Sequence, residues 1–464
     1  MPLPDLIEIV PLEKPVRAEI TVPGSKSITN RALILAALAD GQTTLQGALW
    51  SEDTQVMVEA LRKLGFELNV EPDREEFCNR TITVRGQGGK IPNAGRADQP
   101  LEIFVGNAGT AARFVATLVC LGQGAYRLHG VPRMHDRPQE ALFGALRELG
   151  YRVDSPNDRL PAVILGAGPR AGECRVSIEK SSQFASGLLL CANPGSWSVE
   201  VIGENREESP YVLMTLKLIR AFPTAGGKFR IEPDASSASY LWAANWLLQS
   251  SEMGESLDEA ARMRTQIQSG SDRLTDISVN RWPHSGWQVD ERLFDLLFRN
   301  PLLPHDTTLP VPAAPSFPRE ISREHDLGDS IMTAAVLAPL TRLMIRLTDL
   351  GRMRLQETER VSALRKELTR CGAKVVEEGD TLTVFPSELH GAEIETYNDH
   401  RMAMCFAILG LKVPGIKIKN PTCVKKTFPN FFQKLAAAPP GGLGATILDA
   451  RAGRKLRLEE LFAD

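Results

Sequence analysis

Residues 23–31 read PGSKSITNR and combine small, hydroxylated and cationic side chains directly before an apolar run with helical spacing. Ser25 or Ser27 can cap such a helix, because a hydroxyl there accepts a hydrogen bond from an N–H group that lacks a partner in the first turn. Capping does not require Lys26 and Arg31, since the helix dipole makes cations near an N-terminus mildly unfavourable. A phosphate or carboxylate explains both cations, because helix N-termini with glycine and hydroxyls bind such anions. The stretch therefore predicts either a capped helix or an anion site.

Other chemistries fit the sequence less well. A nucleotide P-loop has glycine directly before its lysine, whereas Ser25 precedes Lys26. A dinucleotide loop leads into a helix, but residues 165–172, LGAGPRAG, lead into ECRVSIE, which has the pattern of a strand. Asp399 and His400 are weak candidates for a metal site, since no other His or Cys stands at ligand spacing. We expect no metal and no cofactor.

The arrangement of small and polar residues before an apolar helix recurs along the chain. Between the recurrences stand second helices, each followed by a strand, as in residues 56–70, 141–154 and 359–385. The pattern predicts a six-fold repeat of strand and helix pairs. Six independently capped core helices are one reading, and six helix N-termini around a common cleft are the other. The six helix starts are residues 23–38, 106–122, 181–192, 234–248, 328–340 and 398–411.

Composition limits the classes of function. A chain of 464 residues with 43% hydrophobic and 24% charged residues is long enough for two or three globular domains. Its net charge of −3 gives no general attraction to nucleic acid or anionic membranes, so anion binding must be local. The seven cysteines lack C-x-x-C spacing, and apolar runs such as Ala32 to Ala39 are far too short to span a membrane. We expect a cytoplasmic protein.

Eight motifs, in chain order, carry a resemblance to a known family: PGSKS-x-x-NRAL, GNAGTA-x-R, PRM-x-x-RP, SSQF, DASSASY, ETER, YNDHRMAM and KTFP. From about residue 8 to residue 435 the chain resembles the 5-enolpyruvylshikimate-3-phosphate synthase family of enolpyruvyl transferases. The resemblance implies an α/β protein with the two-domain enolpyruvyl transferase fold. Each domain would hold three repeated helix-and-strand units, as an inside-out α/β barrel, with the active site in the interdomain cleft.

The resemblance also implies domain bounds. The first domain is expected over residues 24–233, and the second over residues 1–23 and 234–435, with a divergent insertion at 249–325. Residues 436–464 are expected to be a C-terminal extension, read as a Pro/Gly linker followed by one short amphipathic helix.

Members of the family transfer the enolpyruvyl group of phosphoenolpyruvate to the 5-hydroxyl of shikimate 3-phosphate and release phosphate, on the pathway to chorismate and aromatic amino acids. Both substrates carry a phosphate and a carboxylate, which arginine forks bind well. The resemblance implies a monomer that binds these small molecules and no nucleic acid or membrane, with glyphosate as a competitive inhibitor. Two rival functions stay open: a carboxyvinyl transferase acting on a UDP-sugar, and a non-catalytic anion-binding relative.

The reaction needs a base for the hydroxyl and an acid for the methylene group. By resemblance, Asp329 is the proton acceptor, and Lys26 and Glu357 are candidates for proton delivery, although Asp329 also suits a helix N-cap. The resemblance assigns shikimate 3-phosphate to Lys26, Ser27, Arg31, Ser181, Ser182 and Gln183, and phosphoenolpyruvate to Arg133, Arg360, Arg401 and Lys426 beside the loop of Asn107, Gly109 and Thr110. The other candidates for substrate binding are Ser209, Tyr211, Asp329, Gln356 and His400.

Four positions depart from the family pattern. Gln356 stands where lysine is usual and Arg352 where asparagine is usual, which predicts a weaker or exchanged contact with shikimate 3-phosphate. Glu208 replaces a serine whose place Ser209 can take. Phe114 replaces the proline after GTA-x-R, one helical turn beyond Thr110, and predicts partial tolerance of glyphosate.

Overall fold

The computed structural model describes residues 3–13, 16–203, 209–249, 277–283, 285–299 and 319–463. Glu208 and most of the expected insertion at 249–325 lie outside the described residues. The chain divides into two compact units, which we call unit A, residues Pro23–Asp234, and unit B, residues Met1–Val22 with Ala235–Asp464. Where the chain enters and leaves unit A, Ser25 N donates to Glu232 O at 2.8 Å and Asp234 N to Pro23 O at 2.9 Å.

Unit A is built around three helices that pack against one another: α1 (Lys26–Leu38), α3 (Gly109–Leu118) and α6 (Ser182–Gly195). Every residue of α3 is buried, as expected for a helix that is apolar on nearly all sides. The other helices of the unit are α2 (Glu52–Lys63), α4 (Pro132–Asp136), α5 (Glu140–Glu148), α7 (Ser209–Ala221) and the 3₁₀ turn η1 (Val119–Leu121).

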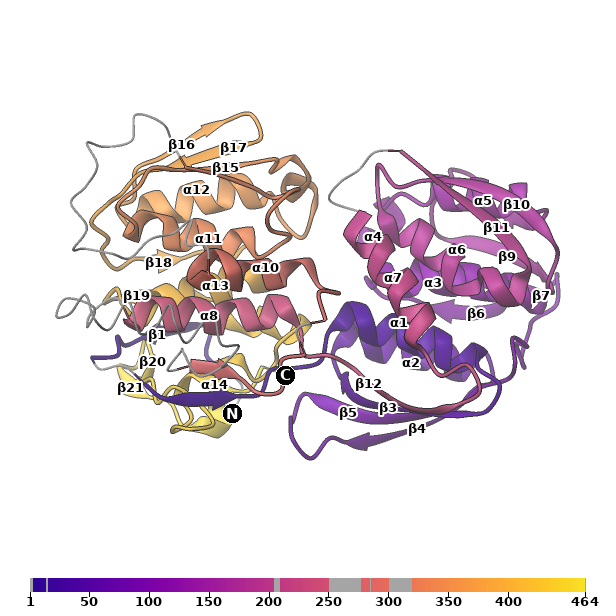
Figure 1. Ribbon diagram of the computed structural model, residues 1–464, viewed down its shortest axis with the longest axis horizontal. Helices are drawn as coiled ribbons and strands as arrows, with labels where there is room; N and C mark the ends of the chain where they lie inside the picture. The colour runs from indigo at the N-terminus through magenta and orange to yellow at the C-terminus, as the bar shows by residue number, and fades with distance from the viewer. Residues whose placement is uncertain are drawn as a thin grey trace. The chain divides into compact units, whose positions relative to one another are not determined.

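Two four-stranded sheets and one parallel pair complete unit A (Figure 1). In both sheets a parallel pair of strands continues into an antiparallel hairpin. The first sheet has the order β12 (Gly227–Arg230), β3 (Gln42–Leu49), β5 (Asn79–Arg85), β4 (Glu67–Pro72), and the second β6 (Leu101–Phe104), β7 (Gln123–His129), β9 (Ala162–Ala167), β8 (Arg152–Asp154). The pair is β10 (Gly172–Ser177) with β11 (Trp197–Ile202), so residues 173–177 are a strand, as predicted.

Unit B repeats this plan around α8 (Ala235–Gln249), α11 (Ile331–Leu337) and α13 (His400–Gly410), which also pack against one another. Its four-stranded sheet has the same pairing, in the order β14 (Arg319–Ser322), β15 (Ile345–Thr348), β17 (Thr381–Val384), β16 (Val375–Glu378). A parallel pair joins β13 (Ile277–Val279) to β2 (Ala18–Ile20). The remaining helices and turns among the described residues of unit B are α10 (Arg292–Phe294), α12 (Arg360–Arg370), α14 (Phe431–Ala436), η2 (Val289–Glu291), η3 (Asp295–Arg299), η4 (Ala338–Leu340), η5 (Gly351–Leu355), η6 (Pro421–Lys426) and η7 (Leu458–Leu461).

The second sheet of unit B brings the two ends of the chain together. Its order is β18 (Glu393–Ile394), β19 (Ile416–Lys419), β1 (Leu6–Ile9), β20 (Ile447–Asp449), β21 (Arg454–Lys455). Figure 1 shows the indigo strand β1 beside the yellow C-terminal strands, and β1 pairs antiparallel with both β19 and β20.

The expectation of an amphipathic helix in the C-terminal tail is therefore wrong. The tail contributes two strands and a single 3₁₀ turn to unit B, rather than an amphipathic helix. Ile447, Leu456 and Leu461 are buried, and β20 covers an edge of β1 that would otherwise be open. The short apolar segment at 447–449 gives too few residues for its period to be recognised behind the Pro/Gly-rich lead-in.

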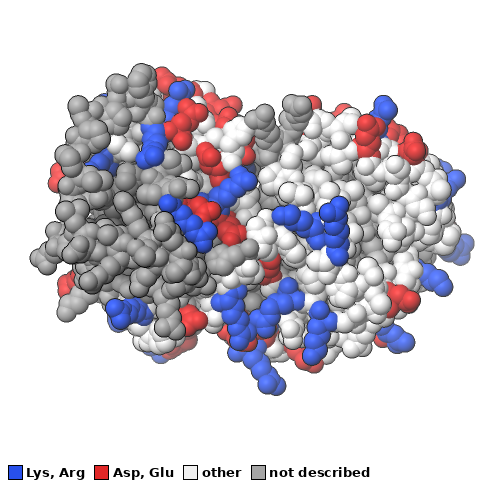
Figure 2. Space-filling view, in the orientation of Figure 1, with Lys and Arg blue, Asp and Glu red and all other residues white. Residues whose placement is uncertain are grey.

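Between the helix starts, the sequence predicts second helices that are each followed by a strand. The structure confirms this order for α2 with β4, α5 with β8, and α12 with β16 and β17. Among the helices that the structure describes, we find none with the length and hydropathy needed to cross a bilayer. Acidic and basic side chains are interspersed over the described part of the face in Figure 2, in keeping with the small net charge of −3.

Candidate active site

Asp329 is the centre of the charged cluster in unit B. It lies in the turn before α11, and Ser330 rather than Asp329 is the N-cap residue of that helix. Its Oδ1 accepts hydrogen bonds from Arg323 Nη2 at 3.0 Å and from Gln356 Nε2 at 3.3 Å. Its Oδ2 lies 3.1 Å from Arg401 Nη2 and 3.7 Å from Arg360 Nη1. The Asp329 carboxylate therefore pairs with the arginines and does not cap the helix.

These guanidinium groups set the ionisation of Asp329. Burial alone would raise the pKa of this carboxyl, but the charges of Arg401, Arg360 and Arg323 hold its pKa well below the usual value. Asp329 is therefore an anion at any physiological pH. A substrate carboxylate or phosphate that takes over the arginines would release the carboxylate to accept a proton.

Arg360, the first residue of α12, connects several acidic groups. Its side chain is 1% exposed, and its Nε lies 2.7 Å from Oδ2 of Asp399, which is fully buried. Its Nη2 lies 2.9 Å from Glu357 Oε2, and Nη1 donates to Gln356 Oε1. Burial opposes the charge, but the surrounding carboxylates raise the pKa of Arg360 above its usual value. The fork geometry of arginine makes these simultaneous contacts possible.

The start of α13 supplies two candidates. Asp399 is the N-cap, and its side chain accepts a hydrogen bond from Arg401 N at 2.9 Å. His400 is 3% exposed, and burial lowers its pKa well below the usual value, so the imidazole is neutral. Among the described residues its Nδ1 has no hydrogen-bond partner, although it lies 3.7 Å from Asp399 Oδ1. A neutral ring with an available nitrogen can bind a substrate oxygen or hydroxyl.

Lys426, at the end of η6, pairs with Glu357. Lys426 Nζ lies 2.7 Å from Glu357 Oε1. Burial raises the pKa of Glu357, but the charges of Arg360 and Lys426 bring it well below its usual value. Glu357 is therefore an acceptor and not a proton donor while these contacts hold.

Sequence reasoning missed three residues of this cluster. Arg323 lies in the turn after β14, and only its position six residues before Asp329 could have indicated it. Ser236, in the first turn of α8, accepts from Arg401 Nη2 at 3.3 Å and donates to Asp290 Oδ2. Asp290 also accepts from Ser330 N at 2.8 Å, and no motif marks it, because it lies in a segment that repeats nothing.

In unit A, the helix that opened the sequence analysis begins at Lys26. Its N-cap residue, Ser25, makes no side-chain capping hydrogen bond, so the capping explanation for that serine is wrong. Lys26 Nζ lies 3.1 Å from Asp53 Oδ2, and Asn30 Nδ2 donates to Thr110 Oγ1 at 2.8 Å. The first turns of α1 and α3 are thereby tied together.

Arg31 is 2% exposed and bonded to the protein itself. Its Nε donates to Thr215 Oγ1 at 2.7 Å, Nη1 to Ser27 O at 2.8 Å, and Nη2 to Ser186 Oγ at 3.0 Å. Its guanidinium also lies 5.4 Å from the centre of the Phe114 ring. Arg31 therefore holds α1, α6 and α7 together, and binding a substrate would require some of these bonds to exchange.

The loop before α3 is held by two arginines. Arg137 Nη1 donates to Asn107 O at 3.0 Å, and Arg113 Nη1 donates to Gly109 O at 3.2 Å. A Cβ on Gly109 would lie 2.7 Å from Arg137 Nη2, 2.8 Å from Arg113 Nη1 and 3.0 Å from Gln183 Oε1. Only glycine fits here without displacing these groups.

The other candidates of unit A stand at helix starts. Ser181 is the N-cap of α6 and accepts a hydrogen bond from Gln183 N at 3.3 Å. Arg133, on α4, has a side chain that is 64% exposed and a 4.0 Å contact with Asp136. Ser182, Ser209 and Tyr211 lie in the first turns of α6 and α7. The structure thus brings Asp329, Gln356, Glu357, Arg360, His400, Arg401 and Lys426 together in unit B, and the remaining predicted residues belong to unit A.

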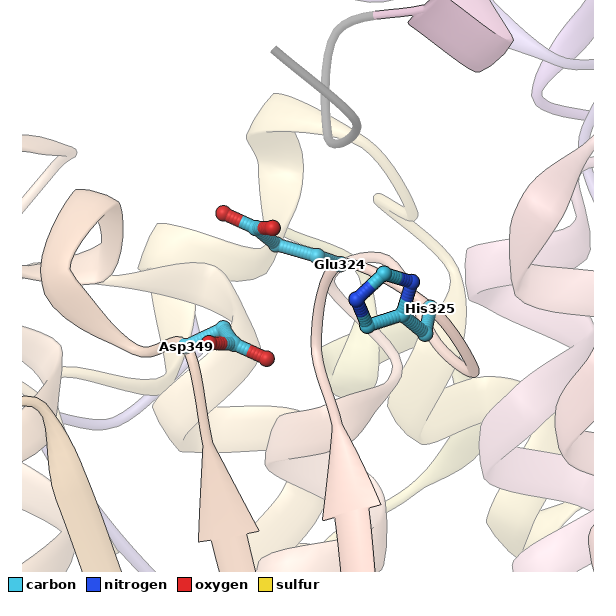
Figure 3. Close-up of side chains that lie close together, drawn as sticks. All are labelled: Glu324, His325 and Asp349. Atoms are coloured by element: carbon cyan, nitrogen blue, oxygen red, sulfur yellow. The ribbon is translucent and has the colours of Figure 1, made fainter. Parts of the chain in front are cut away.

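A second cluster lies where the strands β14 and β15 end. Glu324, His325 and Asp349 each offer one ligand atom, and these atoms lie within 4.8 Å of one another (Figure 3). Asp349 Oδ2 already accepts hydrogen bonds from Ser322 Oγ at 2.5 Å and Thr348 Oγ1 at 3.2 Å. These bonds explain the position of Asp349 without a cation, and we assign no metal to the cluster.

Together these features define a mixed α/β protein in which one carboxylate, that of Asp329, lies among the guanidinium groups of Arg323, Arg360 and Arg401. Residues 10–226 and 320–435 match the EPSP synthase (3-phosphoshikimate 1-carboxyvinyltransferase) family. The chain belongs to this family, and it is an enzyme of the class EC 2.5.1.19.

Individual relatives agree with this assignment. The 3-phosphoshikimate 1-carboxyvinyltransferase of Opitutus terrae is 36% identical over 94% of this chain and 98% of its own length. The enzyme of the same name from Trichormus variabilis is 36% identical over 93% of this chain and 98% of its own length. The EPSP synthase structure from Acinetobacter baumannii superposes with a TM-score of 0.66 at 20% identity, covering 96% of this chain and all of that one, which shows the shared fold.

Proposed function

We propose that this chain joins the enolpyruvyl group of phosphoenolpyruvate to the 5-hydroxyl of shikimate 3-phosphate and releases phosphate. The observation that carries the proposal is the ionised Asp329, whose side chain is 16% exposed and lies among three guanidinium groups. Such a site offers both a base and a binding place for the carboxylate and phosphate of the substrates. The names of the relatives favour the shikimate substrate over a UDP-sugar.

In this proposal each unit contributes residues that bind the substrates. Phosphoenolpyruvate is held by Arg360, Arg401 and Lys426 of unit B, together with Arg133 and the loop of Asn107, Gly109 and Thr110 of unit A. Shikimate 3-phosphate is held at the starts of α1, α6 and α7, by Lys26, Ser27, Arg31, Ser181, Ser182, Gln183, Ser209 and Tyr211, with Asp329, Gln356 and His400. Each unit has the inside-out α/β arrangement, in which the helix starts present these groups.

The chemistry follows from the protonation of the groups. Asp329 takes the proton of the 5-hydroxyl as its oxygen bonds to the enol carbon, and an acid protonates the methylene group. In the elimination that follows, the methyl group loses a proton and the carbon–oxygen bond to phosphate breaks, with its electrons leaving on the phosphate. Arg360 and Lys426 keep Glu357 ionised in this structure, so the Lys26 ammonium donates the proton to the methylene group in the addition. The Glu357 carboxylate then accepts the proton that the methyl group loses in the elimination.

Phosphate release from the purified full chain tests the proposal. We expect release when phosphoenolpyruvate is supplied with shikimate 3-phosphate and none with UDP-N-acetylglucosamine. Release with the UDP-sugar alone would establish the rival transferase, and release with neither would establish the non-catalytic relative.

Removing one arginine from the proposed phosphoenolpyruvate site should weaken binding of this substrate. We expect Arg401→Ala and Arg133→Ala each to cost about 1.5 to 3 kcal/mol of binding free energy, because each deletes a charge-assisted hydrogen bond. Titration calorimetry measures the change. Arg152→Ala, which removes an exposed arginine paired with Asp154 at 2.9 Å, is the control and should leave binding unchanged. Unaltered affinity in both site variants would make the two arginines structural.

Phe114 is expected to affect the response to glyphosate through the backbone of α3. The Phe114 ring is fully buried, and the Arg31 guanidinium lies 5.4 Å from its centre. Proline at 114 cannot donate to the Thr110 carbonyl, so Phe114→Pro should shift the start of α3.

We expect Phe114→Pro to lower the inhibition constant of glyphosate while the KM for phosphoenolpyruvate stays nearly unchanged, since a small shift separates ligands of similar charge and different length. Phe114→Leu keeps the helical backbone and is the matched control. Steady-state inhibition constants for glyphosate, measured for both variants, test this prediction. Equal inhibition constants in the native protein and Phe114→Pro would show that Phe114 is a core residue only.

A further inference from the structure

Glu367, in the middle of α12, is a fully buried carboxylate outside the cluster around Asp329. Both of its oxygens accept hydrogen bonds. Oε1 accepts from the Tyr397 hydroxyl at 2.8 Å, and Oε2 accepts from Arg370 Nη1 at 2.8 Å and from Glu395 N at 3.2 Å. Two of the three donors belong to residues 395–398, the segment that leads directly into α13.

This segment has an unfavourable backbone conformation. Tyr397 has φ +54° and Asn398 φ +56°, so two consecutive residues with side chains occupy the left-handed region. Such conformations persist only where the surroundings hold them. Asp399 follows at once as the N-cap of α13, and Arg401 bonds to it two residues later. The strained turn therefore sets where the arginine and the N-cap carboxylate lie.

The turn is also bonded to the segment that carries Lys426. Asn398 Oδ1 accepts from Asn420 Nδ2 at 3.1 Å. Asn420 is the N-cap residue of η6, has φ +45°, and its N donates to Asp5 O at 2.7 Å. η6 ends at Lys426, whose ammonium pairs with Glu357. One chain of contacts thus reaches from Glu367 to both cation-bearing segments.

We propose that Glu367 is a positioning residue for the reaction, acting through Tyr397 and Asn398 on the placement of Arg401 and Lys426. The inference rests on the proposed roles of these two cations in binding phosphoenolpyruvate. Glu367 itself touches no substrate.

A carboxylate suits this position better than a neutral side chain. Burial and the hydrogen bond to Glu367 raise the pKa of Tyr397 to about 12, so the phenol keeps its proton and donates it. Oε2 accepts hydrogen bonds from two donors, Arg370 Nη1 and Glu395 N. In Glu367→Gln an amide nitrogen at that place could not accept either bond, because it is itself a donor. Removing the carboxylate should therefore loosen the turn rather than leave it as it is.

Tyr397→Phe tests the proposal by removing only the hydroxyl. We expect kcat/KM for phosphoenolpyruvate to fall by about 5- to 50-fold, because small misplacement of binding groups is costly, while KM for shikimate 3-phosphate changes less than about twofold. Tyr151→Phe is the matched control: it removes a buried hydroxyl that donates to Gly168 O at 2.8 Å in unit A. It should lower the melting midpoint to a similar degree and leave both kinetic constants alone.

A second pair of variants separates positioning from folding. Asn398→Gly accepts the left-handed backbone without strain but loses the bond to Asn420, whereas Asn398→Asp keeps an acceptor oxygen and tolerates the same conformation. We expect the glycine variant to stay folded with reduced kcat/KM for phosphoenolpyruvate, and the aspartate variant to restore most of it. Kinetic constants unchanged in both Tyr397→Phe and Asn398→Gly would overturn the proposal. A native enzyme that releases no phosphate would instead overturn the proposed function.

Discussion

Replacing Asp329 with asparagine is expected to lower turnover by about 10²- to 10⁴-fold, the usual effect of removing a positioned base. Asparagine has nearly the same shape and can still accept from Arg323, so the fold should persist. It cannot take a proton from the 5-hydroxyl. The expected loss therefore lies in kcat.

Affinity for phosphoenolpyruvate should behave differently. Asp329 lies 3.7 Å from Arg360 and 3.1 Å from Arg401, so it would compete with the substrate for these arginines if they bind phosphoenolpyruvate as proposed. The neutral amide removes this competitor, so we expect the anionic substrate to bind at least as tightly to Asp329→Asn. Rapid-quench measurement of phosphate release gives the chemical step, and calorimetry gives the affinity. The control is Asp154→Asn, a surface aspartate 2.9 Å from Arg152. Turnover within about tenfold of the native rate would exclude Asp329 as the base.

The same substitution should change how stability depends on pH. The pKa of Asp329 is depressed in the folded protein, so its ion pairs stabilise the fold above the ordinary aspartate pKa, and this stabilisation is lost as the pH falls. The native protein should therefore lose more stability on acidification below about pH 4 than Asp329→Asn does.

How much of this site the sequence predicts depends on where each residue stands. Asp329, Arg360 and Arg401 stand at or just before helix starts that repeat along the chain, and short apolar helices fix such positions reliably. The helical spacing of the apolar residues predicts where these three residues lie, and the family motifs predict their roles.

Residues outside the repeat were not predictable in this way. Arg323 follows a strand end, and Asp290 lies in a 3₁₀ turn, where neither spacing nor capping constrains the residue type. For Arg31, in contrast, the sequence indicates the residue but not its contacts. Its type and place suggest that it binds a ligand, yet its bonds to Thr215 and Ser186, which are far from it in sequence, form only once the helices are packed.

Replacing Arg360 with methionine is expected to give the largest loss of stability among the substitutions considered. The side chain is 1% exposed and lies 2.7 Å from Asp399, whose carboxylate is fully buried, and 2.9 Å from Glu357. Methionine fills the space but leaves these charges without their main partner. Breaking a buried pair from one side costs about 3 to 5 kcal/mol, because the remaining charge stays desolvated. Chemical denaturation of the full chain should show a decrease of this size.

The control lies on the same helix. Arg365 pairs with Glu377 at 2.8 Å and its side chain is 39% exposed, so Arg365→Met should cost no more than about 1 kcal/mol. Arg360→Lys keeps the charge, but one ammonium cannot reproduce the fork that bonds Asp399 and Glu357 together. We expect the lysine variant to recover part of the stability and little of the affinity for phosphoenolpyruvate.

The pH dependence of this loss identifies its cause. Burial raises the pKa of Glu357, while Arg360, ahead of Lys426, is the charge that does most to bring it well below its usual value. A depressed pKa stabilises the folded protein above the ordinary glutamate pKa and ceases to do so as the carboxylate takes up a proton. The difference in unfolding free energy between the native chain and Arg360→Met should therefore be greatest near neutral pH and shrink on acidification. A difference that stays constant as the pH falls from 7 to about 3, well below the ordinary glutamate pKa, would mean that lost packing, and not the ion pairs, makes Arg360 necessary.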